Sequence, residues 1–438
     1  MSSVYLQTFG CQMNVADSNG LAYQAWSLGC TFTEEPGEAD ILIVNTCAIR
    51  EKAETRVYGR LGQLKNIKRP GSKLLVAGCL AEKDRQVMQK KAPHVDALLG
   101  PREYRRFKQL LAQWGVPTDA PPPQTEMRAA SAEDDPGHDG AAQFAHLRAL
   151  VSITRGCEKF CTYCIVPYTR GPLESLDPEE IEAHIRREIR CGAKEITLLG
   201  QNVNSYIHGP TGLNFAGLLR RLSAIDGLER LTFLTSHPKD FDGDVVDALA
   251  QLPNVQPRLH LPVQCASNRV LAAMARLYTI EEYLEKIAYF RERLPRWALT
   301  TDLIVGFPGE SEADFAQTLE LVERGTFEAA FIFAYSPRSG TPAATMAAQV
   351  PPQEKIRRLQ VLNTAQMQRT NDFHQSFIGE TVPVIVSGPS KKDASRMAGK
   401  TGHNVTVVWP RDARSEHRPC VDIAVEQAYN WGLAGRVA

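Results

Sequence analysis

The sequence of 438 residues lacks several features that would place it in common classes of protein. It has no long hydrophobic run, since the longest aliphatic stretch near the start, Ile41 to Val44, is far shorter than the roughly 20 residues of a membrane span. No signal peptide or Arg-rich transit peptide precedes the first strand-like run, Val4 to Leu6, so we expect a cytoplasmic protein without a membrane partner. The chain has no charge excess, with 50 basic and 50 acidic residues, so overall charge indicates neither a nucleic-acid nor a membrane partner.

Local charge and composition indicate where domains begin and end. Residues 1–116 carry 16 basic and 11 acidic side chains, a net charge of +5 that is compatible with a polyanionic partner. Residues 117–145 are rich in Pro, Gly and acidic residues, a composition that cannot bury much surface, and we predict a flexible linker there. The predicted domains are therefore residues 1–116, 146–372 and 373–438.

The first predicted domain alternates short apolar strands with helices, a pattern typical of a parallel α/β sheet. We expect strands at Val4–Thr8, Ile41–Asn45 and Lys73–Ala77, and helices at Ser18–Leu28 and Glu51–Leu64. Three cysteines, Cys11, Cys47 and Cys79, fall just after the three strands. Because ligand sites of open α/β sheets gather at the carboxyl ends of strands, these thiols are candidate ligands.

The second predicted domain, residues 146–372, repeats a strand–helix unit about six times, which favours an open (β/α)6 partial barrel over a closed eightfold one. Its expected strands are Leu150–Thr154, Glu195–Leu199, Leu231–Thr235, Arg258–Pro262, Leu299–Val305 and Ala329–Ala334. One helix start is clear, because Asp177 is a good N-cap and Pro178 suits the first helical position.

Residues 373–438 lose the helical pattern and predict a small antiparallel β-barrel. The expected strands are Thr381–Ser387, Asn404–Trp409 and Val421–Val425. Four basic residues cluster between the first two strands: Lys391, Lys392, Arg396 and Lys400. They form either a phosphate-contacting edge or an ordinary solvated hairpin loop, and local sequence does not decide between the two.

A C-x3-C-x2-C motif is formed by Cys157, Cys161 and Cys164. Three thiolates at this spacing can bind three irons of a [4Fe-4S] cluster and leave the fourth iron open for a small molecule. The spacing resembles the signature of radical S-adenosylmethionine (SAM) enzymes, in which the open iron binds the amino and carboxylate groups of SAM. Zinc sites and chance also produce C-x2-C pairs, but the residues that follow the motif favour the iron–sulfur interpretation.

A second three-cysteine cluster is credible at Cys11, Cys47 and Cys79. These cysteines are 36 and 32 residues apart, and by spacing alone such thiols are more often inert and buried. Their positions between strand and loop, with small neighbours such as Gly10 and Gly78, favour a ligand role instead. The other four cysteines are interpreted as structural or free thiols: Cys30, Cys191, Cys265 and Cys420.

Two more residues are expected to contact SAM. Tyr163 lies between the last two motif cysteines, where its ring can pack against an adenine or shield the cluster from water. Gly200 ends a predicted strand at the face where backbone carbonyls would accept hydrogen bonds from the SAM amino group, although a glycine after a strand is commonly a plain turn. No side chain is assigned a catalytic role, and three histidines near strand ends are assigned no ligand role: His208, His237 and His260.

Taken together, the chain resembles the methylthiotransferases, a radical-SAM family, over nearly its whole length. The matching segments are Thr8–Asn14, Asn45–Arg50, Gly78–Ala81, the Cys157–Cys164 motif, His260–Gln264, Asp302–Glu310 and Tyr335–Pro342. The last 66 residues resemble the family's TRAM domain, a small RNA-binding β-barrel, over residues 373–438. One departure is the run from Gln264 to Ser267, where Cys265 and Ala266 stand in place of the family's more usual Ser and Gly.

Within the family, Val166–Gly171 and Gly200–Tyr206 resemble the tRNA-modifying MiaB branch. The resemblance implies that the protein converts N(6)-dimethylallyladenosine at position 37 of tRNA to its 2-methylthio derivative. It further implies that Cys157, Cys161 and Cys164 bind the cluster that reduces SAM to a 5′-deoxyadenosyl radical. Cys11, Cys47 and Cys79 would bind a second [4Fe-4S] cluster that carries the sulfur, and the partners would be tRNA, SAM, an electron donor and a sulfur source.

Two other functions remain open on the sequence. The same chemistry could act on a ribosomal protein or on another modified tRNA adenosine. The chain could also be a non-catalytic iron–sulfur protein that binds RNA.

Overall fold

The computed structural model describes residues 1–48, 51–123, 142–412, 415 and 417–438. The described chain forms two compact units. The first contains residues 1–123 with Arg155–Glu158 and Ile165–Leu173, and the second contains residues 142–154, Lys159–Cys164 and Glu174–Ala438. The division therefore passes through the C-x3-C-x2-C motif. Most of the predicted linker, residues 124–141, lies outside the described residues.

The first unit is built on a five-stranded sheet in the order β2-β1-β3-β4-β5, and every pairing in it is parallel. The strands are β1 (Ser3–Thr8), β2 (Thr31–Phe32), β3 (Ile41–Thr46), β4 (Lys73–Gly78) and β5 (Ala97–Leu99). The three longer strands confirm the predicted ones, whereas the short strands β2 and β5 were not predicted. Every residue of β3 is buried, as expected for a central parallel strand covered on both faces.

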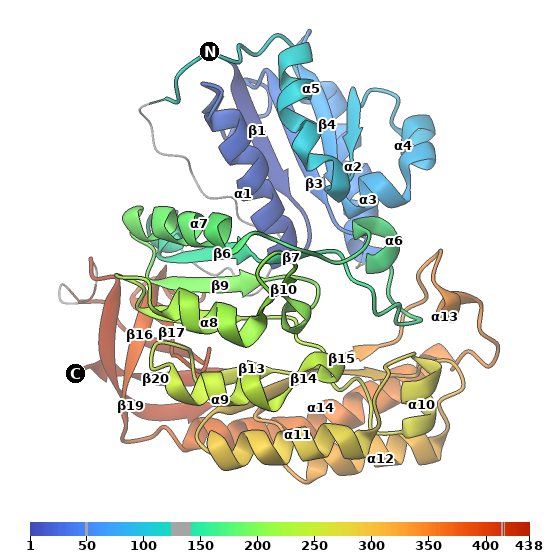
Figure 1. Cartoon of the computed structure of the whole chain (residues 1–438), viewed down its shortest axis with the longest axis vertical. Coiled ribbons are helices and arrows are strands. Elements are labelled where there is room, and N and C mark those ends of the chain that lie inside the picture. The colour runs from blue at the N-terminus through green and yellow to red at the C-terminus, as the bar shows by residue number, and fades with distance from the viewer. Residues whose placement is uncertain (49–50, 124–141, 413–414, 416) are drawn as a thin grey trace. The chain divides into compact units, whose positions relative to one another are not determined.

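Helices cover both faces of this sheet, as Figure 1 shows in blue and cyan. On one face, α1 (Gln12–Trp26) and α5 (Phe107–Gln113) pack against alternate strand residues such as Ile43 and Leu75. On the other face, α2 (Glu51–Ile67), α3 (Cys79–Lys83) and α4 (Arg85–Lys91) pack against the intervening residues. Helix α1 begins six residues before the predicted start at Ser18, directly after Cys11.

The core of the second unit contains six parallel strands in two three-stranded sheets, β12-β9-β6 and β13-β14-β15. The strands are β6 (Arg148–Ser152), β9 (Glu195–Leu199), β12 (Arg230–Phe233), β13 (Arg258–His260), β14 (Ala298–Val305) and β15 (Ala329–Ala334). Main helices follow them: α7 (Pro178–Arg190), α8 (Phe215–Ser223), α9 (Gly243–Gln251), α11 (Ile280–Arg293), α12 (Glu312–Glu323) and α14 (Pro352–Gln375). The six predicted strand–helix units are therefore present, and Asp177 caps α7 by accepting from the backbone N–H groups of Glu179 and Glu180.

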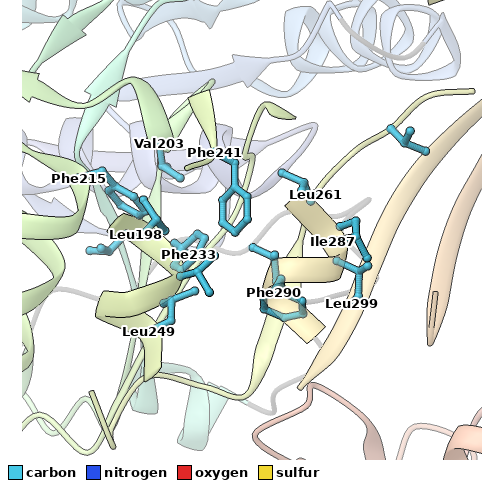
Figure 2. Packing of buried hydrophobic residues seen from close by; sticks show 14 of the residues in the cluster. Leu198, Val203, Phe215, Phe233, Phe241, Leu249, Leu261, Ile287, Phe290 and Leu299 are labelled. Atoms are coloured by element: carbon cyan, nitrogen blue, oxygen red, sulfur yellow. The ribbon is translucent and has the colours of Figure 1, made fainter. Parts of the chain in front are cut away.

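Apolar side chains of these helices and of one face of these six strands form one hydrophobic core (Figure 2). Phe215 of α8 meets Phe233 of β12 edge-on, with ring centroids 5.1 Å apart. Phe290 of α11 packs in the same core and is fully buried. Each large side chain of this kind contributes about 1.5–3 kcal/mol on burial, so the core fixes the strands whose ends carry the candidate site.

The C-terminal residues form a closed barrel in the order β16-β17-β18-β20-β19. Its strands are β16 (Thr381–Pro389), β17 (Arg396–Lys400), β18 (Thr406–Pro410), β19 (Cys420–Tyr429) and β20 (Gly432–Val437). The prediction of an antiparallel barrel needs one correction, because β18 and β20 pair in parallel. Strand β20 turns back from β19 in a hairpin and closes the barrel against β18, which runs in the same direction.

The barrel is fastened to the rest of the second unit. Residues Ala142–Leu147, at the end of the predicted linker, form a 3-10 helix whose Phe144 and Leu147 pack into the barrel core beside Trp409. Arg148 of β6 donates to the Ile385 carbonyl and to the Ser387 hydroxyl, both at 3.0 Å. Among all described residues, no helix is long and apolar enough to cross a membrane.

Candidate metal centres

The first sheet brings the three scattered cysteines to one edge. The register pairs Thr8 with Asn45 and Thr46 with Gly78, so β1, β3 and β4 end at the same level. Cys11 precedes α1, Cys47 directly follows β3, and Cys79 opens α3 directly after β4. We call these three residues the N-terminal cysteine site. Cys47 and Cys79 are buried and Cys11 is partly exposed.

Glycines let the backbones of this edge approach one another. Gly10 has φ of 128°, and a Cβ atom at its position would lie 2.5 Å from the Cys47 Cβ. Gly78 has φ of 99°, and a Cβ atom there would lie 2.2 Å from the Thr46 carbonyl oxygen. Only glycine fits both the left-handed conformation and the available space, so the geometry of the site requires glycine at these two positions.

A buried polar network holds two of the three cysteine loops together. The Asn14 amide donates to the Thr46 carbonyl at 3.0 Å, and the Cys11 thiol donates to the Asn14 Oδ1 atom at 3.4 Å. The Asn45 amide donates to the Asn14 carbonyl at 2.8 Å and to the Ser18 hydroxyl at 2.9 Å. The loops after β1 and β3 are thus connected by side chains rather than by chance proximity.

A buried arginine, Arg170, lies within this site and was not predicted as part of it. It ends α6 (Val166–Arg170), which belongs to the first unit and packs Ile165 against Cys79. Its guanidinium pairs with the Asp17 carboxylate of α1 at 2.7 Å, and the two side chains are only 5% and 9% exposed. Burial alone would lower the pKa of Arg170, but the neighbouring Asp17 charge raises that pKa well above its usual value, so the cation persists.

The thiols of the site differ in their tendency to ionise. A hydrogen bond from the Cys47 thiol is the largest effect on Cys11 and, with help from Arg170, lowers the pKa of Cys11 to about 6 against the effect of burial. Burial raises the pKa of Cys79, although the charge of Arg170 opposes that change. The thiolate is the form that binds metal, so Cys11 is prepared for ligation at neutral pH.

The donor set fits an iron–sulfur cluster better than a single ion. Within the residues that the structure describes, no three His, Cys, Asp or Glu side chains converge on one metal ion. A [4Fe-4S] cluster does not require such convergence, because each thiolate binds a different iron. Three cysteines at one buried edge, one of them with a lowered pKa, suit that arrangement.

In the second unit, the part of the motif from Lys159 to Cys164, which we call the motif loop, is held by hydrogen bonds of Thr162. Its N–H donates to the Met274 carbonyl at 3.1 Å, its hydroxyl donates to the Ala273 carbonyl at 2.9 Å, and its own carbonyl accepts from Ala343 at 2.9 Å. Cys161 is buried, Cys164 is partly exposed, and the Cys164 N–H donates to the Cys161 carbonyl at 2.9 Å. Cys157 belongs to the first unit, where its N–H donates to the Gly171 carbonyl at 3.1 Å.

A second buried arginine, Arg276, contacts this loop. Only 4% exposed, it donates to the Cys161 sulfur and to the Tyr163 hydroxyl, both at 3.4 Å. It also donates to the Tyr278 hydroxyl at 3.1 Å and to the Pro262 carbonyl at 3.0 Å. Within the described part of the chain, Arg276 forms no ion pair with a carboxylate. The predicted SAM contact Tyr163 is therefore placed in a cation-centred network beside Cys161.

Unsatisfied polar atoms gather at the carboxyl ends of β6, β9 and β12. Buried atoms without a hydrogen-bond partner among the described residues occur on Thr154, Gln201, Asn202, Asn204, Ser236 and His237. Gly200 lies among them, and a Cβ atom at its position would lie 2.0 Å from the Thr154 hydroxyl oxygen. Burial is the main cause that lowers the pKa of His237 to about 2, so this ring is neutral. Buried polar atoms are normally bonded, so these residues fit a polar ligand such as SAM.

Comparison with known proteins places the chain in a family. Residues 151–322 match the model of the Radical SAM superfamily, and residues 3–100 match the model of the Uncharacterized protein family UPF0004. A curated tRNA-2-methylthio-N(6)-dimethylallyladenosine synthase of Moorella thermoacetica is 42% identical over 98% of this chain and 97% of its own. The chain belongs to the family of tRNA-2-methylthio-N(6)-dimethylallyladenosine synthases. The synthase of Geobacter metallireducens is similarly related, with 40% identity over 99% and 98% of the two chains.

Solved structures agree with the radical SAM fold of this synthase family member. The methyltransferase TsrM of Kitasatospora setae, solved with cobalamin and a [4Fe-4S] cluster, superposes with a TM-score of 0.57 at 12% identity and covers 78% of this chain and 77% of its own. The cobalamin-dependent radical enzyme OxsB gives a TM-score of 0.52 at 11% identity over 83% and 56% of the two chains. At these identities the likeness shows the fold alone.

The structure of this synthase family member adds residues that the sequence did not reveal. Arg170 lies in the segment Val166–Gly171, but nothing in that segment indicates that it pairs with Asp17, 153 positions earlier. Arg276 follows a short helix, α10 (Asn268–Ala273), and its sequence neighbours carry no motif that predicts contact with Cys161.

Proposed function

We propose that this protein catalyses the 2-methylthiolation of N(6)-dimethylallyladenosine at position 37 of tRNA. The observation that carries the proposal is the gathering of Cys11, Cys47 and Cys79 at one strand edge, in a chain that also contains the radical SAM motif. The curated relatives with which the chain shares nearly its full length are named for this product.

The cysteines would hold two [4Fe-4S] clusters. Cys157, Cys161 and Cys164 would bind the cluster that contacts SAM, and Cys11, Cys47 and Cys79 would bind the second. When bound, these groups supply radical chemistry at an aromatic C–H bond together with the sulfur and the methyl group that are added there. An aromatic C–H has no acidic proton, so ordinary base chemistry does not suffice.

The chain's own residues bind, orient and shield these groups. The Asn14 network holds two cysteine loops in place, and the Arg170–Asp17 pair fills the space beside Cys79. In the second unit, Arg276 fixes Cys161 and Tyr163 from one side. The unsatisfied polar atoms near Gly200 provide donors and acceptors for SAM.

The tRNA would be held partly by the C-terminal barrel, acting as a TRAM domain. Of its basic cluster, Arg396 pairs with Asp393 at 3.5 Å and Lys400 donates to the Thr406 hydroxyl at 2.7 Å, whereas Lys391 and Lys392 lie in the exposed turn between β16 and β17. Phosphate contacts give affinity without reading sequence, which suits a partner recognised by its loop. The protein would work in the cytoplasm, with an electron donor and a sulfur source.

Mass spectrometry of tRNA nucleosides tests this proposal. A strain that lacks the protein should contain N(6)-dimethylallyladenosine in place of its 2-methylthio form, and expression of this chain should restore the methylthio form. An undiminished amount of the methylthio nucleoside in the strain without this protein would contradict the proposal. It would favour a ribosomal protein or another adenosine as the substrate. Absence of 5′-deoxyadenosine after anaerobic incubation with SAM and reductant would instead favour a non-catalytic RNA-binding protein.

A further inference from the structure

Two phenylalanines of β15 are unusually exposed for a strand inside an α/β domain. Phe331 is 55% exposed and Phe333 is 49% exposed, and β15 pairs with β14 alone among the described strands (Figure 1). Parallel strands of such domains are normally covered on both faces. A pair of large rings left open on one strand is therefore a candidate binding surface.

The open rings lie on the face of the sheet that the helices do not cover. The alternate residues of β15, Ala330, Ile332 and Ala334, pack against the helix-covered core. The register pairs Asp302 with Phe331 and Ile304 with Phe333, and it pairs His260 with Thr300 on the neighbouring strands. Paired residues share a face, so one surface of three strands contains His260, Thr300, Asp302, Ile304, Phe331 and Phe333.

This surface is polar at one side and apolar at the other. The His260 Nε2 atom lies 3.6 Å from an Asp302 carboxylate oxygen, and its Nδ1 atom is 3.0 Å from the Thr300 hydroxyl. The same imidazole meets the Phe331 ring edge-on, with centroids 5.9 Å apart. Phe333, which pairs with the partly buried Ile304, then extends the apolar part away from the polar group.

We propose that this surface binds the apolar N6 substituent of the target adenine, and that Phe331 and Phe333 determine specificity for it. The inference rests on the proposed function and names a subsite for its substrate. A branched hydrocarbon group can cover both rings, while the His260–Asp302 pair offers hydrogen bonds to the polar edge of the base. A substituent that ends in a carboxylate would meet the Asp302 charge, so the surface selects against it.

Two anticodon stem-loop RNAs test the subsite. One carries N(6)-dimethylallyladenosine at the target position, and the other carries N(6)-methyladenosine, which lacks the branched hydrocarbon group. Binding and methylthiolation are measured under anaerobic conditions for the natural chain and for Phe331→Ala and Phe333→Ala. The natural chain should prefer the dimethylallyl RNA. Each variant should reduce that preference by about 10- to 100-fold, because it weakens the interaction with the dimethylallyl RNA and leaves the methyl RNA unaffected. Phe331→Leu should keep most of the preference.

Ile356→Ala is the matched control, because Ile356 of α14 is 52% exposed but lies on an outer helix. It should leave both RNAs unchanged. If both phenylalanine variants keep the full preference in binding and turnover, the subsite assignment is wrong. If the natural chain forms no methylthio product yet binds the dimethylallyl RNA more tightly, and the variants lose that difference, the subsite stands while the proposed function fails.

Discussion

Each of the two cysteine regions contains one buried arginine, but only one of these arginines has a carboxylate partner. In the N-terminal cysteine site, Arg170 pairs with Asp17 at 2.7 Å. In the motif loop, Arg276 contacts the Cys161 sulfur, two tyrosine hydroxyls and a carbonyl, and no carboxylate pairs with it in the described chain. The first site therefore balances its own charge, whereas the second leaves a buried cation facing a cysteine.

This difference indicates how the two sites depend on their clusters. A buried cation without a counter-charge is costly, and an anionic thiolate-bound cluster would compensate Arg276. Arg170 is already compensated, so the N-terminal cysteine site can keep its structure before a cluster is bound. We therefore expect loss of iron to disturb the motif loop more than the N-terminal cysteine site.

Removal of whole cysteine sets should have the largest effect. Two triple variants are compared, one with Cys11, Cys47 and Cys79 changed to Ala and one with Cys157, Cys161 and Cys164 changed to Ala. The natural chain should bind about eight irons after anaerobic reconstitution, and each variant should bind about four, because each set holds one four-iron cluster. A variant that keeps all of its iron would show that its set is not a ligand set.

Breaking the ion pair of the N-terminal cysteine site should cost about 3–5 kcal/mol of stability, since Asp17→Asn leaves the buried Arg170 cation without a counter-charge. Denaturant unfolding of the iron-free protein measures this cost. The exposed pair Arg220–Asp244, with a similar separation of 2.9 Å, is the control, and Asp244→Asn should cost less than about 1 kcal/mol. Equal costs for the two substitutions would contradict the buried pairing.

The effect of substituting Arg276 on the free energy of unfolding should depend on iron content and change sign with it. In the iron-free protein, Arg276→Met removes an uncompensated buried charge, so stability should rise or change by less than about 1 kcal/mol. In the reconstituted protein, the same change should destabilise by about 1–3 kcal/mol, because a favourable contact to the ligated Cys161 is lost. Arg170→Met should destabilise both forms, since it leaves Asp17 unpaired.

The smallest effect concerns thiol reactivity. The pKa of Cys11 is lowered to about 6, chiefly by the hydrogen bond from Cys47, and that of Cys79 is raised by burial. Alkylation of Cys11 in the iron-free protein should therefore rise with pH through a midpoint near 6 and be lost below it. Cys79 should remain unreactive through neutral pH, as mass spectrometry of the labelled peptides would show. A Cys11 midpoint above pH 8 would contradict the assigned hydrogen bond.

Sequence patterns predicted the long elements well because these have strong periodicity. The strand expected at Ile41–Asn45 is β3 (Ile41–Thr46), and the strand expected at Ala329–Ala334 is β15 with identical bounds. The short strands β17 and β20 were missed, since their Gly- and Arg-containing sequences lack alternation and are set by barrel closure. The start of α1 was also missed, because its first turn has no side-chain cap.

The ligand candidates could be proposed from sequence, but their surroundings could not. Cysteines after strand ends predict a shared edge, and the parallel register of β1, β3 and β4 provides it. The partners of Arg170 and Arg276 are distant in sequence and depend on tertiary packing. The exposure of Phe331 and Phe333 likewise follows from which face the helices cover, and the sequence AAFIFA alone does not determine that face.

One incubation tests the division of roles between the two cysteine sets most directly. The Cys11, Cys47 and Cys79 triple variant is given SAM, a reductant and a dimethylallyladenosine stem-loop under anaerobic conditions, and both 5′-deoxyadenosine and methylthio product are quantified. We expect that 5′-deoxyadenosine still forms while no methylthio product appears. Methylthio product from this variant would contradict the claim that the N-terminal cysteine site provides the sulfur.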